Sequence, residues 1–110
     1  MLKKTILIDL DGVLNTYNGS FDEKIIPPIK TGAREFIKEL SEKYKIKIFT
    51  TRNRLLTSKW ITDNGLQDWI DDVTNIKELC HLIIDDRCIG FNGDFGELKK
   101  QIENFKVWYR

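Results

Sequence analysis

An apolar stretch near the start of the chain, Thr5-Ile6-Leu7-Ile8, limits the possible folds more than any other feature. It contains β-branched residues, and apolar and polar side chains do not alternate along it. A strand with one face in water would alternate, so this run predicts a strand covered on both faces, as in a parallel sheet. Further strands are expected at residues 46–49, 72–74 and 82–84, with a fifth from Cys88 to Phe91.

Helical patterns are found between and after these strands. Three helices are expected, near residues 33–40, 55–64 and 94–105. The buried side of the last helix is expected to consist of Phe95, Leu98, Ile102 and Phe105. Residues 12–30 contain glycine, asparagine and a proline pair, which is typical of a long loop or flap. Strands alternating with helices predict an α/β fold: one three-layer, Rossmann-like domain over residues 1–110, with a mostly parallel sheet and helices on both faces.

Composition narrows the possible partners. Hydrophobic residues make up 41% of the 110 residues and charged residues 32%, the balance of a soluble globular domain. A net charge of +1 gives no electrostatic reason to expect nucleic acid or an anionic membrane as partner. The first apolar run is too short for a signal peptide or a membrane span, so a cytoplasmic location is expected. A zinc site of Cys80, His81 and Cys88 would lack a fourth protein ligand.

Polar residues end three of the predicted strands. Asp9 and Asp11 end the first, Thr50 ends the second, and Asp85 with Asp86 ends the strand at 82–84. Parallel strands end along one edge of their sheet, where open α/β folds bind ligands. Four carboxylates in one place repel one another unless a cation is present. Mg²⁺ is the best fit, because it uses few carboxylates and takes further oxygens from water and phosphate.

The spacing of the first two aspartates suits acid–base chemistry. In an extended chain Asp9 and Asp11 would lie on one side, about 6.6 Å apart, so that one carboxylate can attack while the other handles a proton. A calcium loop of the EF-hand type is excluded, because Val13 and Ser20 stand where ligands belong. Arg52 and Arg87, next to the strand ends, are candidates to bind a substrate anion, and a surface ion pair is the alternative for each. Thr51 leaves open which threonine binds phosphate.

These segments resemble the motifs of the haloacid dehalogenase-like (HAD) superfamily, most of whose members are phosphatases. Residues 6–14 are similar to its first motif, hhhDxDG, and residues 46–50 resemble the second, a strand ending in threonine. Lys77 occupies the place of the third-motif lysine, although a solvated surface lysine is the alternative. Residues 82–86 match the fourth motif in its double-aspartate form.

The resemblance implies a role for each matching residue. Asp9 would be the nucleophile that forms an aspartyl-phosphate, and Asp11 the general acid and then base. Thr50 and Lys77 would hold the phosphoryl oxygens. Mg²⁺ would be bound by Asp9, the backbone carbonyl of Asp11 and Asp85, with support from Asp86. The implied activity is hydrolysis of a phosphomonoester, either a small molecule or an exposed phosphate on a larger one.

The chain departs from many members of that superfamily in having no room for a cap domain. Thirty-eight residues separate Asp11 from Thr50, and 26 separate Thr50 from Lys77, and both intervals are too short to hold one. The site is therefore expected to be open, closed at most by the loop from Tyr17 to Phe21 or by a partner subunit in a homo-oligomer. Two other functions stay open: a catalytically silent metal- or partner-binding module, and a receiver-like phosphoacceptor domain.

Overall fold

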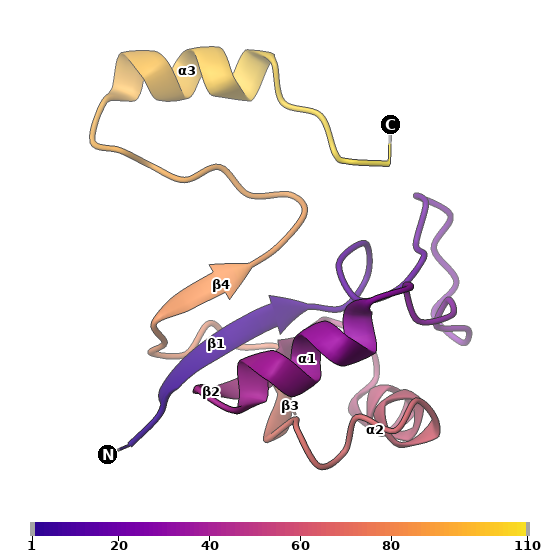
Figure 1. Ribbon diagram of the computed structural model, residues 1–110. Helices are drawn as coiled ribbons and strands as arrows, with labels where there is room; N and C mark the ends of the chain where they lie inside the picture. Colours follow the sequence, from indigo (N-terminus) through magenta and orange to yellow (C-terminus); the bar gives the residue numbers. More distant parts are fainter. Residues whose placement is uncertain (1, 110) are drawn as a thin grey trace.

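A four-stranded parallel sheet forms the centre of the computed structural model, which describes residues 2–109 (Figure 1). The strands are β1 (Lys4–Asp9), β2 (Tyr44–Phe49), β3 (Asp72–Thr74) and β4 (Leu82–Ile84), in the spatial order β3-β2-β1-β4. Every neighbouring pair is parallel. The predicted α/β, Rossmann-like class is confirmed, with β1 between β2 and β4.

The main core lies between this sheet and two helices, α1 (Ala33–Ser41) and α2 (Arg54–Asp63). Because side chains alternate along a strand, Ile6 and Ile8 of β1 share one face of the sheet. They form the core cluster with Ile37 of α1 and Ile61 of α2, and each of these four is at most 5% exposed. Hydrophobic burial on this face holds the sheet and these helices together.

The connection between β3 and β4 contains no helix. These strands lie at opposite edges of the sheet, so residues 75–81 must pass β2 and β1. Glu78 fixes this path, because its carboxylate accepts a hydrogen bond from Lys47 Nζ of β2 at 2.7 Å. Lys77 lies in this connection and is exposed.

The last helix, α3 (Phe95–Glu103), begins after Asp94, whose carboxylate caps it by accepting hydrogen bonds from the backbone N–H groups of Gly96 and Glu97. Its expected burial is wrong: no residue of α3 is buried, and Phe95 is 76% exposed. The expected fifth strand is also wrong, since residues 88–91 are irregular. Gly90 interrupts that segment, and the chain leaves the sheet after β4, so that α3 stands apart from it in Figure 1.

The segment after α3 returns to the body of the protein. Val107 is buried, and the indole N–H of Trp108 donates to the backbone carbonyl of Gly12, directly after β1. These contacts attach the segment after α3 to the body of the protein. Among residues 2–109, no helix has the length and apolar character needed to cross a bilayer.

Candidate metal and phosphate site

Three carboxylates meet where β1 and β4 end. Asp9 is the last residue of β1, while Asp85 and Asp86 directly follow β4. Ile8 is paired with Ile84 in the sheet, so the next residue of each strand emerges at the same edge. One oxygen from each of Asp9, Asp85 and Asp86 lies within 4.8 Å of the others. The predicted convergence of the first and fourth strand ends is therefore observed.

This cluster places negative charge in a partly buried position. Burial, followed by the charge of Asp85, raises the pKa of Asp9 to about 8. Burial also raises the pKa of Asp86, whose Oδ2 is buried and has no hydrogen-bond partner among the described residues. An orphaned carboxylate oxygen beside two further carboxylates matches the all-oxygen donor set that Mg²⁺ prefers. The donors present therefore fit a hard divalent cation.

Asp11 is held away from that group of three by other partners. Its Oδ2 accepts a hydrogen bond from Arg52 Nε at 2.8 Å, and its Oδ1 accepts one from Asn15 Nδ2 at 3.0 Å. The carboxylate of Asp11 is not part of the three-oxygen cluster. A separate position for the second aspartate is compatible with proton transfer rather than ligation by its side chain.

Asn15 is a site residue that the sequence did not reveal. It is completely buried, and besides its bond to Asp11 its side-chain oxygen accepts hydrogen bonds from the backbone N–H groups of Gly12 and Tyr17. These bonds fix the turn that follows β1. Asparagine four residues after an aspartate in a glycine-containing loop was the available signal, but many loops share it.

Gly12 and the C-terminal aromatic residues form a wall next to the cluster. Gly12 has φ +85°, and a Cβ there would lie 2.2 Å from Asp86 Oδ2 and 3.3 Å from Tyr109 Cε1. Only glycine fits both this backbone conformation and this close approach. Arg87 is exposed and donates from Nη2 to the Tyr109 hydroxyl at 2.8 Å, so it lies on this wall.

Thr50 directly follows β2, as the sequence predicts, and is 7% exposed. Its Oγ1 accepts a hydrogen bond from the backbone N–H of Arg52 at 3.2 Å, which leaves the hydroxyl proton free to be donated elsewhere. Thr51, in contrast, is exposed. Of the two threonines, Thr50 is therefore the one that is fixed at the sheet edge.

The two remaining basic candidates differ in their surroundings. Arg52 is buried and pairs with Asp11, so it belongs to the site. Lys77 forms no ion pair with any of the four aspartates within residues 2–109. Its contribution stays a prediction. The cysteines and His81 do not join a group of three potential metal ligands in the described part of the chain, whereas the aspartates do.

Comparison with known proteins supports the fold and no specific activity. No family model matches the chain, and no curated protein matches it. The solved structure of a conserved protein from Bacteroides thetaiotaomicron is similar, with a TM-score of 0.61 and 23% sequence identity. The match covers 97% of this chain and 95% of that protein. At this level of identity the likeness shows the shared fold alone.

Proposed function

We propose that the chain is a magnesium-dependent phosphomonoester hydrolase that acts through an aspartyl-phosphate on Asp9. The observation that carries this proposal is the convergence of the Asp9, Asp85 and Asp86 oxygens within 4.8 Å at the carboxyl edge of a parallel sheet. Such a cluster is unfavourable without a cation, and a cation there would lie beside the proposed nucleophile. The resemblance of the surrounding motifs to those of HAD phosphatases points in the same direction.

Asp9, Asp85 and Asp86 are the side chains that would hold Mg²⁺, as judged from their oxygens and from the orphaned Asp86 Oδ2. When bound, the metal offsets the repulsion between these carboxylates and the phosphoryl oxygens of a substrate. The buried Thr50 hydroxyl, which retains a free proton, would donate to one phosphoryl oxygen. Lys77 would reach a second phosphoryl oxygen from the exposed β3–β4 connection.

Asp9 and Asp11 carry out the chemical steps of the proposed reaction. A carboxylate oxygen of Asp9 attacks phosphorus, the ester P–O bond breaks, and the leaving oxygen takes a proton from Asp11. Asp11 then removes a proton from water, whose oxygen attacks the phosphorus of the aspartyl-phosphate. The products are the free alcohol and inorganic phosphate, and the Asp9 carboxylate and the protonated Asp11 side chain are regenerated.

Release of inorganic phosphate from an aryl phosphate, with and without Mg²⁺, tests this function. Repeated turnover that stops in excess chelator is the expected result. One stable phosphorylation per chain would instead indicate a receiver-like phosphoacceptor. A protein that binds Mg²⁺ but neither releases phosphate nor becomes phosphorylated would be a silent module.

A further inference from the structure

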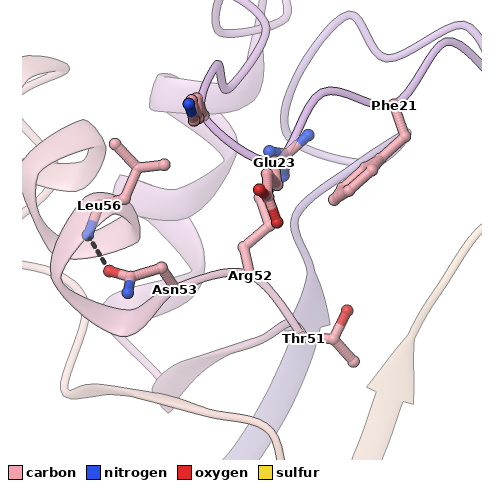
Figure 2. Close-up of a pocket in the computed structure, with 7 residues that line it drawn as sticks. Phe21, Glu23, Thr51, Arg52, Asn53 and Leu56 are labelled. Atoms are coloured by element: carbon pink, nitrogen blue, oxygen red, sulfur yellow. Dashed lines mark hydrogen bonds between the residues drawn. The ribbon is translucent and has the colours of Figure 1, made fainter.

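A pocket of about 640 Å³ lies between the flap and the start of α2, and Arg52, which binds Asp11, is part of its lining (Figure 2). Its lining consists of Phe21, Glu23, Lys24, Thr51, Arg52, Asn53 and Leu56. None of the four aspartates of the proposed catalytic site lines it. The proposed reaction therefore leaves this pocket without a role.

The guanidinium of Arg52 has one free donor nitrogen. Its Nε binds Asp11 and its Nη1 donates to the backbone carbonyl of Asp22 at 2.7 Å. Nη2 is buried and has no hydrogen-bond partner among the described residues, although the Arg52 side chain is only 1% exposed. A buried donor without an acceptor is costly, and a charged one more so. Such a group points to an acceptor that binds from outside the chain.

The start of α2 adds a second feature that favours an anion. Asn53 caps this ten-residue helix through a hydrogen bond from Leu56 N to its side-chain oxygen, drawn in Figure 2. The first turn of α2 contains no acidic residue. The partial positive charge of a helix N-terminus is therefore not offset by a carboxylate of that turn.

The flap contributes charge and apolar surface. Lys24 adds a second cation, and Glu23 is the one carboxylate of the lining. The Phe21 ring stacks against the guanidinium, with 4.5 Å between Arg52 Cζ and the ring centroid, and remains 57% exposed. Leu56 opposes it from α2 and is partly exposed. A planar or apolar body can pack between these two side chains while its charged end reaches Arg52.

We propose that this pocket binds the leaving group of the substrate and that this group carries a second anion, a carboxylate, which pairs with Arg52 Nη2. This inference rests on the proposed phosphatase function, because it places the phosphoryl group at Asp9 and the rest of the ester beyond Asp11. The substrate class is then an organic phosphate with a planar or apolar body and a carboxylate at its far end.

Two matched substrates test the charge directly: 4-carboxyphenyl phosphate and 4-carbamoylphenyl phosphate. They have nearly the same shape, but only the first carries the second anion. The amide withdraws electrons more strongly, so intrinsic reactivity favours the neutral ester. We expect kcat/KM to be at least about tenfold higher for the carboxylate ester, the contribution of one charge-assisted hydrogen bond.

Variants assign that preference to the pocket. Arg52→Lys keeps the charge but removes the free Nη2, and should bring the ratio of the two kcat/KM values close to one. Lys24→Gln, on the exposed flap, should lower the ratio severalfold without a risk to folding. Lys99→Gln changes an exposed lysine of α3, outside the lining, and should leave the ratio as in the wild type. A wild-type ratio of one or less overturns the proposal.

A binding measurement separates failure of the pocket from failure of the proposed function. Backbone amide signals of residues 21–24 and 52–56 are followed by NMR during titration with 4-hydroxybenzoate or 4-hydroxybenzamide. Shifts with the carboxylate alone, reduced in Lys24→Gln, support the pocket even when neither ester is hydrolysed. Hydrolysis of both esters at equal efficiency, with equal or absent shifts for the two probes, rejects the pocket while the phosphatase function stands.

Discussion

Arg52 Nε donates a hydrogen bond to Asp11 Oδ2 at 2.8 Å and thereby joins the ends of β1 and β2. The Arg52 side chain is 1% exposed and that of Asp11 is 18% exposed, so water screens the pair only weakly. Arg52 also binds the flap through the carbonyl of Asp22. One guanidinium therefore contacts both the proposed proton donor and the flap.

We expect Arg52→Met to lower the free energy of unfolding by about 3 kcal/mol, because the Asp11 side chain would lose its ion-pair partner in a largely buried place. Arg54→Met is the matched control, since Arg54 pairs with Asp72 at the surface, where its side chain is 68% exposed. An exposed pair contributes about 0–1 kcal/mol. Urea denaturation of both variants checks this. Equal losses of unfolding free energy in the two variants would show that the buried Arg52–Asp11 pair stabilises the fold no more than the exposed Arg54–Asp72 pair does.

Gly12→Ala should disturb the carboxylate cluster as well as the backbone. Gly12 and Gly32 have nearly the same φ, +85° and +90°, but a Cβ at Gly12 meets Asp86, whereas at Gly32 it meets nothing within 4 Å. Gly32→Ala should lower the free energy of unfolding by about 1–2 kcal/mol through backbone strain alone. Gly12→Ala should cost about 1–3 kcal/mol more, because a side chain must shift. Chemical denaturation of the two variants gives this difference. Mg²⁺ should raise the Tm of Gly12→Ala less than that of the wild type, whereas the rise for Gly32→Ala should equal that of the wild type. The same rise in both variants would contradict the close approach of Gly12 to Asp86.

The positions of Asp9 and Asp85 could be predicted because they depend on local pattern and on one topological rule. Each follows an unbroken apolar run, and parallel strands end at one edge. Burial of Arg52 and its pairing with Asp11 could not be predicted, because the two residues are 41 positions apart and nothing in the local sequence links them. The sequence gives equally little sign that Trp108 donates to Gly12, 96 positions away.

For the last helix, the sequence predicts a buried face that the structure does not have. The apolar spacing of Phe95, Leu98, Ile102 and Phe105 predicts a buried face, and the structure leaves that face exposed on a helix apart from the sheet. Amphipathic spacing indicates which side of a helix prefers to be covered, but not whether the same chain covers it. The path of residues 85–94 decides this, and glycine and asparagine in that segment leave its direction undetermined.

Stability without metal should fall as pH rises. The pKa of Asp9 is raised from 3.8 to about 8 in the folded protein, mainly by burial and then by Asp85. Between these values the folded chain binds more protons than the unfolded chain, so the stabilising contribution is present at low pH and is lost as pH approaches 8. Thermal unfolding in excess chelator, followed from pH 5 to pH 8.5, should therefore show a declining Tm.

Mg²⁺ should oppose that decline, because it binds the ionised carboxylates and competes with protons. The rise in Tm on adding Mg²⁺ should grow with pH across the same range. Asp9→Asn serves as the control, since it removes the titrating group and should flatten the profile in chelator. A wild-type profile as flat as that of Asp9→Asn would show that Asp9 ionises normally.

Asp9→Asn should also abolish the proposed activity, because an amide cannot form the acyl-phosphate. We expect phosphate release from an aryl phosphate to fall by at least about 10³-fold, to the background of the assay. Asp68→Asn changes an exposed aspartate away from the cluster and should retain full activity. Undiminished turnover by Asp9→Asn, with its fold verified by circular dichroism, would rule out Asp9 as the nucleophile.

Asp11→Asn should reveal which step needs a proton. An alkyl alcohol is a poor leaving group and requires protonation as the P–O bond breaks, whereas 4-nitrophenolate leaves without it. General acid catalysis contributes about 10²–10⁴-fold, so the variant should lose most of its rate on an alkyl phosphate and much less in the first step on 4-nitrophenyl phosphate.

Because Asp11 also activates water in the second step, the variant should accumulate the aspartyl-phosphate and show a burst of 4-nitrophenolate. The asparagine side chain has a single oxygen, which can accept from Arg52 Nε or from Asn15 Nδ2 but not from both through their present bonds, so circular dichroism should verify the fold of the variant. Equal losses on both esters without a burst would mean that Asp11 orients the site and transfers no proton.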